Sequence, residues 1–275
     1  MNIFSVIQTK LKSVTPTRAY ARTQLPKDMA AIPGGPFKIN VKFRIRKCGS
    51  YESTPDQSKD FSKLHSFANR ESEVVLAPYA MDLTPVTNAQ YEEFLKASGY
   101  KPKEPTNFLK HWRDGAPPAG RRGHPVVYVD IDDARAYGKW AGKRLPTEEE
   151  WQFAAQGTDG RKYPWGNREP KPQDNLCNGF CDTTTPVKRF PAGRSPFGIY
   201  DLCGNTWKWT ESERAHGVNR FAILRGGSHY KLKGSHWYTD GGPQEVSFGA
   251  KCLLTWPGLD RCATVGFRCV VDLER

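Results

Sequence analysis

One stretch decides the fold of this chain: Pro196-Phe-Gly-Ile-Tyr-Asp-Leu-Cys-Gly-Asn-Thr-Trp-Lys-Trp-Thr210, followed after a polar loop by Ile223-Leu-Arg-Gly-Gly-Ser228. Trp207 and Trp209 are one residue apart, so in an extended chain both rings lie on the same side. A strand over these residues therefore buries a heavy aromatic face. The Gly-Gly pair at 226–227 allows the backbone to turn tightly or to approach other backbone closely.

Motifs occur in order along the chain, both within this stretch and on either side of it. They are Met29-Ala-Ala-Ile-Pro-Gly-Gly-Pro-Phe37, Pro85-Val-Thr-Asn-Ala-Gln-Tyr91, His124-Pro-Val-Val127, Trp140-Ala-Gly-Lys-Arg-Leu-Pro-Thr-Glu-Glu-Glu-Trp151, Tyr163-Pro-Trp-Gly-Asn167, Gly204-Asn-Thr-Trp207, Arg225-Gly-Gly-Ser228 and Gly266-Phe-Arg268. Together they resemble the formylglycine-generating enzyme, or sulfatase-modifying factor, family. The resemblance implies a single α+β domain, related to C-type lectin domains, with much irregular loop structure. It leaves the activity open, because one fold hosts many functions.

The composition is that of an ordinary globular protein. The chain has 275 residues, of which 37% are hydrophobic and 25% charged, enough for one large domain. No apolar run approaches the roughly 20 residues that a membrane helix needs, so we expect a soluble or peripheral protein without a membrane span. The net charge of +12 comes from basic residues scattered along the sequence. This scatter favours a basic, solubilising surface over a nucleic-acid partner.

Residues 1–26 form a basic segment ahead of the first motif. They contain 4 basic residues and no acidic residue. The apolar run at 3–7 is too short for a secretory signal. We therefore expect either a disordered leader or an organellar transit peptide, followed by one sulfatase-modifying-factor domain over residues 27–275. No internal repeat divides this domain.

Capping patterns predict three helices. Their expected caps are Thr87 to Gly99, Asp130 or Asp132 to Gly142, and Thr147 to Gly157. Strands are predicted over residues 37–45, 73–83 and 125–129, from alternating or continuous apolar residues. The polar segment 49–70 and the segment 102–123, rich in Pro and Gly, are predicted to be loops.

The resembled enzymes oxidise cysteine with a copper(I) ion that two thiolates hold just after the Arg-Gly-Gly-Ser turn, and soft thiolates suit such an ion. The resemblance places the first thiolate at position 231 and the second near 237–238. This chain has Lys231, Trp237 and Tyr238 there. We therefore predict that copper is not bound and that formylglycine is not made by that mechanism. Two thiols side by side in a groove near Ser228 would contradict this prediction.

The 229–244 loop is polar and aromatic, a combination typical of pockets for sugars, nucleotides or peptides. We predict that a small molecule, a glycan or a peptide binds to this loop. The expected contacts are His229, His236, Trp237, Tyr238, Asp240 and Gln244. The alternative for each residue is structural: the ring completes the core, or the polar group faces water.

Two other functions stay open. His229, His236 and Asp240 could form a metal site, so a metal-dependent (non-haem iron) oxidase is one alternative. Related sulfoxide synthases of ergothioneine synthesis bind iron largely through an added helical domain with a His-x-x-x-His-x-Glu pattern, and this sequence lacks that pattern. The other alternative is a non-catalytic subunit that binds a protein partner through its loops.

The resemblance also implies structural calcium sites, which need oxygen ligands. One maps to Asp201, Gly204, Thr206 and Lys208, where a lysine replaces the expected acid. An ammonium group repels the ion and can fill its place, so we expect no calcium at this site. The other maps to Asn175, the Leu176 carbonyl and Asp182. Its alternative is an ordinary Asx turn.

Seven cysteines leave at least one unpaired within the chain, and their spacing fits no zinc framework. The resemblance implies cysteines at positions that Gly138 and Ala155 occupy here, so Cys269 loses its expected partner. This loss favours a reducing compartment, cytoplasmic or organellar. A Cys177–Cys181 disulfide is the alternative that the sequence leaves open.

Arg225 and Arg268 each lie in a motif that contains glycine. A guanidinium group carries five donors in a fixed fork, which suits it to joining loops. We predict that both arginines bridge buried carbonyls or carboxylates rather than contact a substrate.

Overall fold

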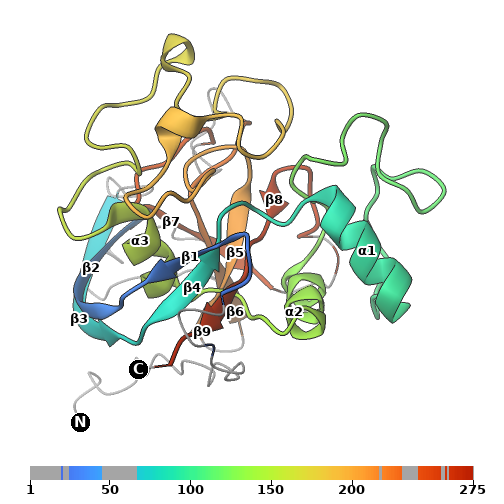
Figure 1. Cartoon of the computed structure of the whole chain (residues 1–275), viewed down its shortest axis with the longest axis horizontal. Helices are drawn as coiled ribbons and strands as arrows, with labels where there is room; N and C mark the ends of the chain where they lie inside the picture. The colour runs from blue at the N-terminus through green and yellow to red at the C-terminus, as the bar shows by residue number, and fades with distance from the viewer. Residues whose placement is uncertain are drawn as a thin grey trace, which may run out of the picture.

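The computed structural model describes residue 20 and residues 25–44, 67–216, 219–230, 241–254, 258 and 260–274. Figure 1 shows short strands and helices joined by long loops, the mixed α+β architecture that the sequence predicted. The basic segment 1–26 lies largely outside the described residues. Tyr20 is described, and its backbone nitrogen donates a 3.0 Å hydrogen bond to the carbonyl of Asp272, so residue 20 joins the C-terminal strand.

Three helices begin and end close to the predicted caps. They are α1 (Asn88–Ser98), α2 (Ile131–Trp140) and α3 (Glu148–Gln156). Each begins with a reciprocal capping box, in which the cap and the third helical residue satisfy each other's backbone donors. Asp130 rather than Asp132 caps α2, and Asp133 is its partner. The left-handed Gly99 ends α1, as predicted.

The strands described form three small sheets. The first has the order β1 (Met29–Ile32), β4 (Tyr79–Asp82), β9 (Val270–Asp272), and the second pairs β2 (Gly35–Arg44) with β3 (Phe67–Leu76). The third has the order β7 (Gly249–Leu253), β6 (Asn219–Arg225), β5 (Trp207–His216), β8 (Val265–Gly266). All pairs are antiparallel except β5 with β8.

Two of the predicted strands differ from the structure. The run 73–83 is divided between β3 and β4, because Pro78 has no backbone donor and the two parts pair with different neighbours. β3 begins at Phe67, inside the predicted loop 49–70, because its first residues pair with the end of β2. Residues 49–66 of that predicted loop lie outside the described part. Residues 125–129 form no strand. Tyr128 adopts a φ of 59°, which breaks the extended backbone.

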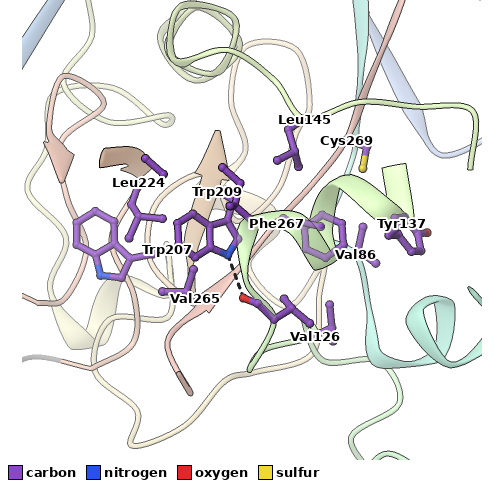
Figure 2. Packing of buried hydrophobic residues seen from close by; sticks show 14 of the residues in the cluster. Val86, Val126, Tyr137, Leu145, Trp207, Trp209, Leu224, Val265, Phe267 and Cys269 are labelled. Carbon is purple, nitrogen blue, oxygen red and sulfur yellow. Dashed lines mark hydrogen bonds between the residues drawn. The ribbon is translucent and has the colours of Figure 1, made fainter. Parts of the chain in front are cut away.

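The core gathers around the two tryptophans of β5, as expected from the sequence. Trp209 is fully buried, and its indole nitrogen donates a 3.0 Å hydrogen bond to the Val129 carbonyl. Figure 2 shows both indoles in one cluster with Phe267 and Tyr137. The rings of Tyr137 and Phe267 lie 5.4 Å apart in an edge-to-face arrangement. This aromatic cluster fixes α1 and α2 to the sheet of β5.

Long loops between α3 and β5 cover one end of the molecule, at the top of Figure 1. They contain two single-turn 3-10 helices, η5 (Pro172–Asp174) and η6 (Pro191–Gly193). Within the part of the chain that the structure describes, no helix combines the length and the apolar character that crossing a bilayer requires.

Candidate functional site

The Arg225–Ser228 turn holds together three segments that are distant in sequence. The Gly226 carbonyl accepts hydrogen bonds from the backbone nitrogens of Gly204, at 2.8 Å, and Gln244, at 3.4 Å. A side chain on Gly227 would clash with the Gly242 carbonyl, only 2.1 Å from its Cβ position. The glycine pair therefore permits the close approach that the sequence analysis expected.

The two described ends of the 229–244 loop lie side by side. Ser228 N donates to Gly242 O at 3.1 Å, and Gly242 N donates to Tyr230 O at 2.7 Å. Two of the predicted contact residues, His229 and Gln244, therefore lie on neighbouring segments at the two ends of the loop. His236, Trp237, Tyr238 and Asp240 lie outside the described residues, as does Lys231. The metal set of His229, His236 and Asp240 stays a prediction for the same reason.

His229 is buried with its ring held in one orientation. Its Nδ1 lies 2.8 Å from the carbonyl oxygen of Asn205, and its backbone nitrogen donates to the same oxygen at 3.1 Å. Because a carbonyl only accepts, Nδ1 carries the proton and Nε2 keeps a free lone pair. Burial lowers the pKa of this imidazole below its usual value of 6.5. A neutral imidazole can accept a hydrogen bond or bind a metal.

Asn205 connects this histidine to the neighbouring loop. It is fully buried and has a φ of 62°. Its amide nitrogen donates to Thr185 O at 3.1 Å, and its amide oxygen accepts from Thr185 N at 3.0 Å and from Asn178 Nδ2 at 3.2 Å. The 175–185 loop is thus fixed to the turn that supports His229.

Two charged residues on loops far apart in sequence act on His229, namely Arg121 and Asp182. Arg121 lowers and Asp182 raises the pKa of its ring, so both charges act on it. Arg121 Nη1 also donates to Thr183 Oγ1 at 2.6 Å. Two large rings in this region are exposed, Tyr230 at 52% and Phe180 at 45%. The sequence analysis did not single out Arg121 or Phe180, because no local pattern indicates which distant loops meet.

Phe180 lies close to the end of the 229–244 loop. The residue before it, Gly179, packs so tightly on Pro243 that a Cβ there would be 2.0 Å from the proline ring. Tyr230 accepts its hydrogen bond from Gly242, the residue before that proline. The backbone at or next to each of these two exposed residues therefore contacts the 242–243 segment.

Lys208 lies at the first of the two implied calcium positions. It is fully buried, and its Nζ donates to the Gly204 carbonyl at 2.7 Å. Burial and Arg268 lower the pKa of the amine to about 7, and nearby Asp201 opposes this shift. The Oδ2 of Asp201 and the Oγ1 of Thr206 are buried and have no hydrogen-bond partner among the described residues. An amine bonded to one of the implied ligands does not fit a calcium ion in the same place.

The second implied calcium position is more open. Asn175 and Asp182 are both exposed, and Asn175 is left-handed with a φ of 52°. The Leu176 carbonyl faces Gly193 so closely that a Cβ there would be 1.7 Å from the oxygen. Among the residues that the structure covers, no three His, Cys, Asp or Glu side chains gather as a metal site. Calcium at Asn175 and Asp182 therefore stays a prediction.

Two thiols do meet near Ser228, although not those that follow it in sequence. Cys177 and Cys203 contact each other in a small buried cluster with Tyr163. Cys203 Sγ donates to the Gln244 carbonyl at 3.3 Å. Because Cys177 is 7% and Cys203 2% exposed, the pair lies beneath the loops rather than along a surface groove. Cys181 is exposed and, like the other described cysteines, is a free thiol.

Arg225 and Arg268 do what the sequence predicted. Arg268 is fully buried and donates to Asp82 O at 3.0 Å and Tyr200 O at 2.6 Å. Arg225, also fully buried, donates to Val246 O at 2.9 Å and to the Gln152 side chain. Both guanidinium groups hold loops together within the domain.

The fold and the Arg225–Ser228 turn define a sulfatase-modifying-factor-type domain. The sequence pattern of the family described as "Sulfatase-modifying factor enzyme 1-like domain" matches residues 15–273. The chain belongs to this family.

Similar proteins in this family differ in activity according to their names. The chain is 34% identical to "Inactive C-alpha-formylglycine-generating enzyme 2" of Bos taurus over 202 residues, which cover 57% of this chain and 67% of that protein. It is 30% identical to "Formylglycine-generating enzyme" of Mycobacterium tuberculosis over 243 residues, covering 68% and 74%. The chain thus aligns with about two thirds of the length of the bovine protein.

A solved structure has the same fold. PvdO from Pseudomonas aeruginosa superposes with a TM-score of 0.59 at 20% sequence identity, covering 94% of this chain and 99% of that one. This likeness concerns the fold alone, and membership of the family does not decide between an active and an inactive site.

Proposed function

We propose that this chain does not make formylglycine by the copper mechanism, and that it binds a small molecule, a glycan or a peptide through the 229–244 loop. The observation that carries the proposal is the side chain at position 231. Lys231 stands where the resemblance implies the first copper thiolate, and Trp237 and Tyr238 stand near the second. An amine and aromatic rings do not provide the soft anionic ligands that copper(I) needs.

The described ends of the loop support a binding role. His229 offers an uncharged ring nitrogen with a free lone pair, held in place through Asn205. Tyr230, the next residue in the chain, and Phe180, whose neighbour Gly179 packs on Pro243, provide exposed aromatic surface. Rings for stacking with a few fixed polar groups are a common means of holding sugars and peptides.

The buried thiols Cys177 and Cys203 do not replace the missing copper ligands in this proposal. Both lie below the surface, and burial raises the pKa of Cys203 well above its ordinary value. A protonated, buried thiol is a poor ligand and is inaccessible to a bulky peptide substrate.

Binding and metal content test the proposal together. A fluorescently labelled sulfatase-type cysteine peptide is titrated by polarisation, and a panel of immobilised glycans is probed in parallel. We expect at least one probe to bind the wild type and to lose roughly tenfold or more in affinity in Trp237→Ala, a loss typical of an aromatic contact. Trp140→Ala, on the outer side of α2, is the control and should bind normally.

Two results would overturn this function. One is equal binding, or no binding, by wild type and Trp237→Ala for every probe. The other is iron or copper at one ion per chain by elemental analysis of protein purified without chelator. The latter result would instead favour the oxidase built on His229, His236 and Asp240.

A further inference from the structure

The Cys177 and Cys203 thiols are a pair that the proposed ligand site does not use. They come from separate loops, on either side of η6, and meet in the cluster with Tyr163. Trp165 packs against this cluster, and its ring stacks on Tyr163 with centroids 5.2 Å apart. Cys177 is 7% and Cys203 2% exposed, and each thiol packs against the other in this cluster.

The backbones of the two loops are also close. Gly204, the residue after Cys203, lies so near Cys177 that a Cβ at position 204 would be 3.4 Å from the Cys177 Cβ. Cys203 Sγ donates to the Gln244 carbonyl at 3.3 Å, and Cys177 is close enough to help burial raise the pKa of the Cys203 thiol. Contact between side chains on closely packed backbones is the arrangement that a disulfide requires.

A metal ion fits this pair less well than a covalent bond. Across the described residues no third His, Cys, Asp or Glu joins the two thiols in a ligand cluster. The burial that raises the pKa of Cys203 opposes the thiolates that a soft metal needs. A disulfide carries no charge and suits an apolar surrounding.

We propose that Cys177 and Cys203 form a reversible disulfide that fastens the 175–185 loop to the turn beneath His229. Each thiol loses one hydrogen, and one sulfur–sulfur bond forms. The two electrons and two protons reduce hydrogen peroxide to two waters, or a small-molecule disulfide to two thiols. The reverse reaction needs a dithiol reductant.

The cross-link has consequences for the loop above it. Oxidation removes the Cys203 S–H that donates to the Gln244 carbonyl, so one end of the 229–244 loop loses a hydrogen bond. It also closes a long loop and restricts the unfolded chain. This inference does not depend on which ligand the 229–244 loop binds.

Peptide mapping of the full chain tests the cross-link. Reduced protein is treated with hydrogen peroxide or oxidised glutathione, alkylated under denaturing conditions and digested with trypsin without reductant. We expect peptides 169–188 and 195–208 to appear joined, and to separate after reduction. Since the first peptide also contains Cys181, the exposed Cys181→Ser variant is the matched control and should keep the cross-link.

Thermal unfolding gives an independent measurement. Oxidation should raise the Tm of wild type and of Cys181→Ser by roughly 5–10 °C. Cys177→Ser and Cys203→Ala should show no such rise. The inference is overturned if the wild type remains fully alkylated at both positions after oxidation, or if the linkage disappears in Cys181→Ser. Both of these results come from the wild type and Cys181→Ser. They therefore do not depend on whether Cys177→Ser and Cys203→Ala, which change buried residues, fold normally.

Discussion

The amino nitrogen of Lys208 lies 2.7 Å from the carbonyl oxygen of Gly204, and the whole side chain is buried. The resemblance to formylglycine-generating enzymes implies an acidic calcium ligand at this position. The lysine instead brings its amino group to an oxygen that the ion would need. Asp201 lies close enough to influence the charge of the amine.

The first prediction concerns calcium at this position. Lys208→Glu restores an acid beside the unpartnered Asp201 Oδ2 and Thr206 Oγ1. We expect calcium to raise the Tm of this variant by roughly 5 °C more than that of the wild type, because a ligand that binds only the folded state stabilises it. Lys110→Glu, an exposed change of the same charge, is the control. Equal calcium responses in all three proteins would show that position 208 does not control the ion.

The second prediction concerns pH. Burial lowers the pKa of the Lys208 amine to about 7, from an ordinary value of 10.5. Between these values the unfolded chain binds a proton that the folded chain does not, so the contribution of Lys208 to stability rises with pH. Relative to Lys208→Met, the free energy of unfolding of the wild type should increase by on the order of 4 kcal/mol from below pH 7 to above pH 10.

Urea unfolding of both proteins at pH 6.5 and pH 9.5 measures most of this change. Other titrating groups affect the wild type and Lys208→Met alike, so the difference between the two proteins isolates residue 208. A difference that stays constant across this interval would mean that the buried amine does not titrate there.

The third prediction concerns the core. Trp209→Phe removes the indole bond to the Val129 carbonyl and leaves a space in a fully buried site. We expect a loss of roughly 2–4 kcal/mol in the free energy of unfolding. Trp140→Phe, at a 40% exposed position, should lose much less. Similar losses for the two variants would show that Trp209 contributes no more to the free energy of unfolding than the partly exposed Trp140.

Local patterns predicted the helices well. The pairs Thr87 with Gln90 and Thr147 with Glu150 encode their caps within four residues, and the structure contains both capping boxes. The apolar run 125–129 misled because its backbone partners are elsewhere: Tyr128 N donates to Cys262 O rather than to a strand. Hydrophobicity alone does not reveal which distant residues supply hydrogen bonds.

The site was predicted less completely than the fold. The order of the motifs located the Arg225–Ser228 turn. It also showed that Lys208 stands where the resemblance implies an acid. It did not reveal that Cys177 meets Cys203, or that Gly179 packs on Pro243, because both contacts join irregular loops without periodicity. Loop contacts of this kind depend on the assembled domain.

One measurement tests the central claim most directly. Purified full-length protein is incubated with a sulfatase-type cysteine peptide, copper and oxygen, with an active formylglycine-generating enzyme as positive control, and the peptide is analysed by mass spectrometry. With Lys231 in place of the first thiolate, the peptide should remain unmodified while the control converts it. Copper-dependent appearance of formylglycine in the test sample would contradict the account.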